Sequence, residues 1–160
     1  MKLPAPVLKL KTSNFKLMLG KAQQRLDEIA AEFADLEPRE RLELLLDFAE
    51  HLPELPSALK AERDAGEHRV HECMTPVYLW VLPEEGHVRV HGDVAPEAPT
   101  VKGFVGILVE AFSGATPAEV MAVPPDVIHR LGLVEALGMV RMRGMSAILN
   151  RIRAEVARWA

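Results

Sequence analysis

One stretch of this chain, residues 77–91, has the composition of β-strands, and segments of helical periodicity lie on both sides of it. Residues 77–82 are rich in β-branched and aromatic side chains, whereas polar and apolar side chains alternate over residues 87–91. The four residues between them, 83–86, contain a proline and a glycine and predict a turn. The sequence therefore predicts one β-hairpin, with Val88 and Val90 facing the core and three polar side chains facing solvent, namely His87, Arg89 and His91.

The segments around the hairpin predict helices. Apolar residues recur at helical spacing over residues 26–33, 42–49 and 145–159, and residues 100–112 predict a buried helix. Thr116 and Pro117 are typical of a helix start, with Glu119 placed to complete a capping box. The order of helices, hairpin and helices predicts an α+β fold, with helices packed on a small antiparallel β-sheet. We expect one domain over residues 21–160, preceded by a flexible extension over residues 1–20.

Composition excludes several classes of function. The formal net charge of the 160 residues is −4, which disfavours binding to nucleic acid phosphates. No apolar run is long enough for a membrane span, so we expect no membrane partner. The chain has one cysteine and cannot form an internal disulfide, which favours a reducing, cytoplasmic location.

That single cysteine, Cys73, lies in a segment without helical period, just before the first predicted strand. Its position supports two interpretations. A free cysteine often packs as a small apolar side chain. A cysteine that is accessible and ionised is instead a nucleophile. Sequence position does not decide between these two interpretations.

Other catalytic arrangements find less support. His68, His71 and Cys73 are three zinc-ligand types in one segment, but their spacing matches no common zinc motif. His87 and His91 share one strand face and are expected to be exposed polar positions. The chain has no Gly-x-Ser-x-Gly elbow and no glycine-rich phosphate loop.

Several segments together resemble the SufE family of sulfur acceptors. The similar stretches are Leu52-Pro53-Glu54-Leu55-Pro56, the Cys73 segment 70–78, Gly92-Asp93, Val101-Lys102-Gly103-Phe104, Phe112-Ser113-Gly114-Ala115-Thr116-Pro117 and Arg141-Met142-Arg143-Gly144-Met145. The resemblance covers residues 26–159 and rests on the order and spacing of these stretches. The chain departs from the family pattern at Glu72, where the family has glycine, and at Tyr78, where it has tryptophan.

The resemblance implies that Cys73 receives persulfide sulfur from a cysteine desulfurase of the SufS or CsdA type and passes it to an iron–sulfur scaffold. The chain itself would bind no cofactor, since the partner desulfurase carries the pyridoxal phosphate, and it would be a carrier and activator rather than an enzyme. Arg141 is the candidate that would stabilise the thiolate or persulfide. The candidates for the desulfurase-facing surface are Asp93, Glu97 and Lys102.

The sequence also leads us to expect a shielded Cys73 that becomes exposed when the partner docks. Val70, Met74 and Val77 are apolar neighbours that could pack down and cover the loop. Glu72, next to the thiol, would tend to raise its pKa. The alternative function is a non-catalytic protein-binding module in which Cys73 is a packing residue.

Overall fold

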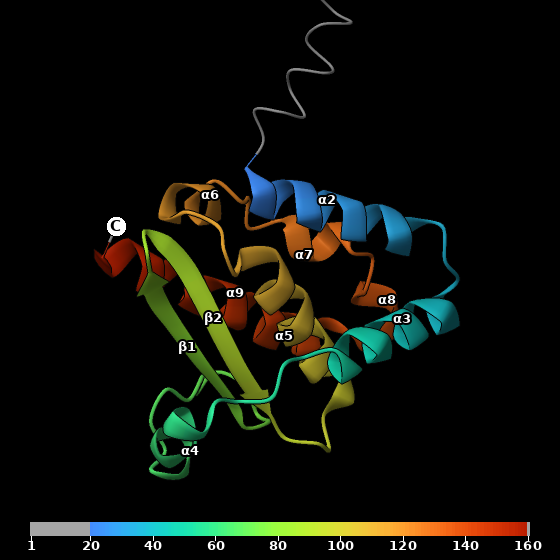
Figure 1. Cartoon of the computed structure of the whole chain (residues 1–160). Coiled ribbons are helices and arrows are strands. Elements are labelled where there is room, and N and C mark those ends of the chain that lie inside the picture. The colour runs from blue at the N-terminus through green and yellow to red at the C-terminus, as the bar shows by residue number, and fades with distance from the viewer. Residues whose placement is uncertain (1–19, 160) are drawn as a thin grey trace, which may run out of the picture.

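The computed structural model describes residues 20–159, so most of the predicted N-terminal extension lies outside the described range. The elements, labelled as in Figure 1, are α2 (Lys21–Ala34), α3 (Pro38–Glu50), α4 (Ser57–Asp64), β1 (Val77–Glu84), β2 (His87–Val94), α5 (Pro99–Phe112), α6 (Pro117–Met121), α7 (Val127–Arg130), α8 (Val134–Leu137) and α9 (Met139–Trp159). Helices pack on a two-stranded antiparallel sheet, which confirms the predicted α+β architecture. Within the described range, no helix combines the length and the apolarity that crossing a membrane requires.

The hairpin is longer than the sequence predicts. Its strands pair in register from Val77 with Val94 to Glu84 with His87, so the connection has two residues rather than four. Glu85 and Gly86 both have positive φ, at 52° and 80°. Two such residues in succession form the turn that best matches the twist of paired strands, and pairing therefore continues through Pro83.

The inner face of the hairpin packs on α5, the buried central helix. Val88 and Val90 are each 1% exposed, as the alternation of the second strand predicts. Helix α5 also packs closely on α3 because two of its residues have no side chain. A Cβ atom at Gly103 would lie 2.1 Å from the carbonyl oxygen of Leu45, and one at Gly106 would lie 2.6 Å from that of Phe48.

The outer face of the hairpin is only partly wet. His87 and Arg89 are exposed as predicted, whereas His91 is half-buried. Burial lowers the pKa of His91, and the charge of Arg89 lowers it further. The segment around α4 contacts this face: the indole of Trp80 donates a hydrogen bond of 3.3 Å to Glu62.

The C-terminal helix α9 crosses behind α5 and reaches the hairpin (Figure 1). Its buried stripe agrees with the predicted helical spacing and comprises Met142, Met145, Ile148, Leu149, Ile152 and Val156. At the predicted start of α6, Thr116 accepts a hydrogen bond from the backbone nitrogen of Glu119. The Glu119 carboxylate accepts from the Lys21 backbone and thereby ties α6 to α2. The short helix α8 is not evident from the sequence pattern.

Candidate functional site

Cys73 lies at the tip of a loop whose base is fixed by the fold. The backbone nitrogen of Val70 donates to the carbonyl of Val77 at 2.8 Å, and both residues are fully buried. The backbone nitrogen of Cys73 donates to the Val70 carbonyl at 3.2 Å. The base of the loop is therefore part of the core, and this backbone hydrogen bond joins Cys73 to it.

The Cys73 side chain is shielded. Only 7% of the residue is exposed, and its Sγ donates a hydrogen bond of 3.5 Å to the carbonyl oxygen of Gly144 in α9. Burial raises the pKa of the Cys73 thiol, and the negative charge of Glu72 raises it further. The thiol is therefore protonated at neutral pH in this conformation, and it is a weaker nucleophile than a free cysteine.

The thiol faces a cavity of about 560 Å³ that is formed between the Cys73 loop, the start of α5 and the start of α9. We call this space the thiol cavity. Its lining residues are Glu72, Cys73, Met74, Thr75, Glu97, Ala98, Pro99, Thr100, Val101, Val140, Arg141, Arg143, Gly144 and Met145. These residues come from three separate parts of the sequence.

Exposed apolar side chains stand at the rim of the thiol cavity. Met74 is 91% exposed and Val140 is 70% exposed, and both line the cavity. Met139, next to Val140 in the chain, is 61% exposed. The expectation that Met74 packs down over Cys73 is therefore wrong, although Val70 and Val77 are buried as expected. Val70 and Val77 are both fully buried, whereas Met74, which lies between them in the loop, is left at the cavity rim.

The structure brings two of the predicted site residues together with Cys73. Arg141 and Glu97 both line the thiol cavity, and Nη1 of Arg141 donates to the Thr100 hydroxyl at 3.2 Å. Lys102 lies on α5 and does not line the cavity.

Asp93 also lies outside the thiol cavity. It pairs across the hairpin with Tyr78, and its carboxylate forms an ion pair of 3.3 Å with Arg63. This ion pair connects β2 to the end of α4.

Sequence reasoning did not assign Arg143 or Val140 to the site. Arg143 lines the thiol cavity and makes no hydrogen bond or ion pair with any other residue between 20 and 159. Both residues lie in α9 but outside its buried stripe. The sequence signal for this surface is an apolar residue, Val140, that lies outside the buried stripe of α9 and close to a charged residue.

The zinc arrangement considered from the sequence does not form. Between residues 20 and 159, one group of three side chains brings metal-ligand atoms within 4.8 Å of one another, and it contains Glu62, Glu67 and His68 but not Cys73. His68 lies 3.4 Å from Glu62, and its ring is tilted by 30° against that of Trp80 with centroids 5.2 Å apart. His68 is thus accounted for by contacts on the outer face of the hairpin.

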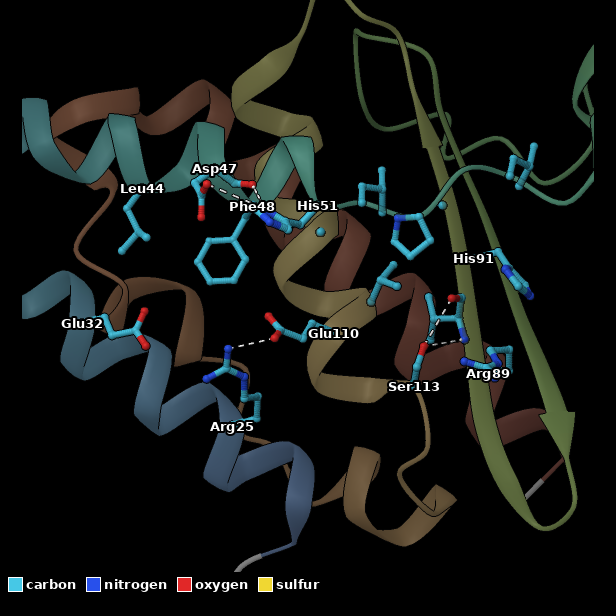
Figure 2. Close-up of a pocket in the computed structure, with 17 residues that line it drawn as sticks. Arg25, Glu32, Leu44, Asp47, Phe48, His51, Arg89, His91, Glu110 and Ser113 are labelled. Carbon is cyan, nitrogen blue, oxygen red and sulfur yellow. Dashed lines mark hydrogen bonds and ion pairs between the residues drawn. The ribbon is translucent and has the colours of Figure 1, made fainter.

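A second cavity, of about 490 Å³, lies between α2, α3, α5 and β2 (Figure 2). We call it the helix cavity. The Arg25 guanidinium reaches from α2 to Glu110 on α5, with an N–O distance of 2.8 Å. His51 contacts the carbonyl of Asp47 at 2.7 Å, and Ser113 bonds the backbone of Val90. Asp47 raises the pKa of His51 through that carbonyl contact and through the charge of its carboxylate.

Comparison with known proteins agrees with this geometry. The family model of SufE, described as an Fe-S metabolism associated domain, matches residues 27–156. An uncharacterised SufE-like protein of Mycobacterium tuberculosis is 39% identical over 129 residues, which cover 80% of this chain and 88% of that protein. SufE-like protein 2 of Arabidopsis thaliana, a chloroplastic protein, is 34% identical over 135 residues, covering 82% of this chain and 50% of that protein.

A solved structure has the same fold. The solution structure of a hypothetical protein from Thermus thermophilus matches with a TM-score of 0.73 and 35% sequence identity, covering 88% of this chain and 97% of that one. The match of the family model extends over most of the chain and includes the Cys73 loop, α5 and α9. The chain therefore belongs to the SufE family and is associated with iron–sulfur metabolism.

Proposed function

We propose that this protein is a sulfur carrier that accepts persulfide sulfur on Cys73 from a cysteine desulfurase and delivers it to iron–sulfur cluster assembly. The observation that carries the proposal is the position of Cys73. The sole thiol of the chain lies at a loop tip, beside a cavity with an exposed apolar rim. Family membership adds the association with iron–sulfur metabolism.

The transfer is a displacement at sulfur. The Cys73 thiol gives up its proton, and its sulfur attacks the outer sulfur of the persulfide on the desulfurase cysteine. A new S–S bond forms at Cys73 while the S–S bond of the donor breaks, and the donor leaves as a thiol that takes up the proton. The carrier ends as a Cys73 persulfide, and no net oxidation or reduction takes place.

The resting conformation protects the sulfur and slows this attack. A buried, protonated thiol reacts slowly, and a buried persulfide is less accessible to reductant and oxidant. The loop tip is attached by the Cys73 backbone bond to Val70 and the thiol bond to Gly144, whereas its base stays in the core. A docked partner that binds the open form of the Cys73 loop therefore shifts the population of loop conformations toward those with an accessible thiol.

The apolar rim supports a protein partner at this place. Met74 and Val140 are too exposed to stabilise the fold, and large exposed apolar residues that gather at one site mark an interaction surface. Arg141 and Arg143 add two cations to the same cavity wall. A cation close to an anionic sulfur stabilises it, which supports a role for Arg141 once the partner has opened the loop.

Sulfur transfer to the purified protein tests the proposal directly. Incubation with a cysteine desulfurase and free cysteine should add the mass of a sulfur atom, and a reductant should remove it. Cys73→Ser should gain nothing and should no longer stimulate sulfide release. Thr75→Ser is the matched control in the same loop and should gain sulfur normally. Stimulation by Cys73→Ser equal to that of the natural protein would disprove the carrier function.

The accessibility of the thiol tests the opening of the loop. Cys73 should react slowly with a small alkylating reagent when the protein is alone. A desulfurase whose own active-site cysteine has been mutated should accelerate this reaction, or protect Cys73 by enclosing it. A rate for the free protein equal to that of free cysteine would contradict the shielded state.

The contribution of Arg141 is tested by its removal. Arg141→Ala should slow sulfur uptake and leave the unfolding midpoint unchanged, because Arg141 is exposed and its one hydrogen bond among the described residues is to Thr100. Arg143→Ala, on the same cavity wall, shows whether one guanidinium or both contribute. Unchanged uptake by both variants would remove the arginines from the site.

A structural role for the cysteine is the second candidate function. Cys73 belongs to the cluster of buried residues that forms the core, which favours a packing role in a protein-binding module. Binding to a desulfurase does not separate the two functions, since both proteins would bind. Sulfur transfer to Cys73 separates them, because a packing cysteine gains no sulfur.

A further inference from the structure

The backbone conformation of α9 does not require a glycine at position 144. Gly144 lies inside α9, its φ is not in the left-handed region, and glycine destabilises a helix interior relative to alanine. Apart from its chain neighbours and the backbone of its own helix, a Cβ atom added at this position would meet one heavy atom of residues 20–159 within 4 Å, the Sγ of Cys73 at 3.6 Å. That distance is an ordinary van der Waals contact, so the resting thiol would tolerate alanine.

Two glycines of α5, in contrast, are required by the packing of helices. An added Cβ would meet backbone atoms at 2.1 Å at Gly103 and at 2.6 Å at Gly106, both belonging to α3. Neither site can accept a side chain without moving a helix. Gly144 has no such neighbour between residues 20 and 159, and the single atom in front of it is the sulfur of the acceptor.

The space in front of Gly144 becomes important when the sulfur carries an adduct. Cys73 is nearly buried, and the thiol cavity, which Gly144 also lines, is its open side. A second sulfur lies about 2 Å from Sγ. When that sulfur turns toward α9, it comes well inside contact distance of a carbon placed 3.6 Å from Sγ.

We infer that Gly144 is a positioning residue for the transferred sulfur: its missing side chain leaves the space that the outer sulfur of a Cys73 persulfide occupies in the closed protein. This inference rests on the proposed function and deepens it. The thiol form needs no glycine at this position, and the persulfide form does. Gly144 therefore contributes to holding the sulfur after uptake and not to the fold of the empty carrier.

Gly144→Ala tests the inference with the intact chain. The unfolding midpoint of the thiol form should stay equal or rise, because alanine favours the helix. Sulfur loading by a desulfurase should yield a persulfide that a reductant removes about tenfold faster, since one methyl of overpacking displaces the outer sulfur toward solvent. Ser146→Ala, in the same helix but not lining the thiol cavity, is the matched control and should keep the normal lifetime.

A desulfurase-independent measurement separates this inference from the proposed function. Methyl methanethiosulfonate attaches an S-methyl group to Cys73 through an S–S bond and thereby places a second sulfur at the persulfide position. The unfolding midpoint should fall on thiomethylation much more in Gly144→Ala than in the natural protein. An equal fall in both proteins, or equal persulfide lifetimes, would overturn the inference. Failure of the natural protein to load sulfur would instead disprove the carrier function, and the thiomethyl comparison would still decide the role of Gly144.

Discussion

The thiol cavity and the helix cavity are similar in size, about 560 and 490 Å³, and both have α5 in their walls. They differ in which polar and charged side chains already have a hydrogen-bond or ion-pair partner. In the helix cavity, Arg25 is paired with Glu110, and Ser113 bonds the backbone of Val90 (Figure 2). The thiol cavity contains the Cys73 thiol and Arg143, which has no hydrogen bond or ion pair with any residue between 20 and 159, and exposed apolar side chains line the same cavity. The volume of a cavity thus says less about function than the groups that remain available in it.

The helix cavity can be understood as the space left where three helices meet the hairpin. Gly106, in its wall, brings α5 against the backbone of Phe48 in α3. Arg25 and Glu110 connect α2 to α5, and Ser113 connects the end of α5 to β2. We therefore expect changes here to alter stability, and changes at the thiol cavity to alter sulfur transfer.

Among changes in the walls of the two cavities, Gly106→Ala should have the largest effect on stability. The added methyl would lie 2.6 Å from the Phe48 carbonyl oxygen, a backbone atom that can move only with α3. Overpacking of this kind costs about 1–3 kcal/mol in free energy of unfolding. Urea denaturation measures it, and the folded fraction should still take up sulfur at the normal rate.

Gly144→Ala is the matched control for this change, since it makes the same substitution in the wall of the other cavity. Its thiol form should be as stable as the natural protein, or more stable by up to about 1 kcal/mol. Equal destabilisation by the two alanine substitutions would contradict the view that Gly106 is required for packing and that Gly144 is not.

The next effect concerns binding at the rim of the thiol cavity. Met74→Ser should weaken the affinity for the desulfurase about tenfold, because a methionine buried at an interface contributes about 1.5–3 kcal/mol. The free energy of unfolding should not change, since Met74 is 91% exposed. Calorimetric titration measures the affinity.

Met121→Ser on α6 provides the comparison for Met74. Met121 is also an exposed methionine, at 36%, and it does not line the thiol cavity. Its replacement should leave the affinity unchanged. A loss of affinity as large as that of Met74→Ser would mean that the partner does not select the rim.

The two regions also differ in how much of their structure can be predicted from the sequence. Periodicity predicts the buried stripe of α9 and the inner face of the hairpin, because burial along an element follows from its repeat. The motif around Cys73 identifies the loop. Periodicity does not predict the exposure of Met74, because the Cys73 loop is neither helix nor strand and its residues follow no repeat.

The thiol cavity itself could be predicted only in part. Arg141 and Glu97 were identified through the resemblance, whereas Asp93 and Lys102, identified in the same way, do not line the cavity. The contact between Cys73 and Gly144 joins residues 71 positions apart, and no local pattern indicates it. The two-residue turn was missed because Glu85 adopts a backbone conformation that its residue type rarely takes.

A smaller effect is expected from the charge of Glu72. Burial is the main cause of the raised pKa of the Cys73 thiol, and Glu72 is the second. Glu72→Gln removes the second cause, lowers this pKa and raises the thiolate fraction at neutral pH. Because Glu72 is exposed, salt screens its charge, and alkylation of Cys73 should accelerate by less than about threefold.

The pH dependence of alkylation measures this effect. The rate should rise with pH to a plateau whose midpoint lies above that of free cysteine, about 8.5, and Glu72→Gln should shift the midpoint downward. Glu97→Gln removes the other carboxylate of the thiol cavity, which is not a cause of the raised pKa, and should leave the midpoint in place. Since the folded protein holds the thiol proton more tightly than the unfolded chain, stability should fall as the pH rises past the pKa of the free thiol.

The smallest effect should come from the ion pair of the helix cavity. Arg25 and Glu110 are 33% and 45% exposed in their side chains, and a surface pair of this kind contributes less than about 1 kcal/mol. Glu110→Gln leaves Arg25 with a second partner, Glu28, at 3.2 Å, so no cation is left buried and unpaired. A double-mutant cycle with Arg25→Gln and Glu110→Gln in urea should give a coupling energy in this range that high salt removes. Sulfur uptake and affinity for the desulfurase should be unchanged in each variant, because the pair bridges α2 to α5 and neither residue lines the thiol cavity. A loss of sulfur uptake at unchanged stability would show that the helix cavity takes part in the transfer, and the separation between the two regions would then fail.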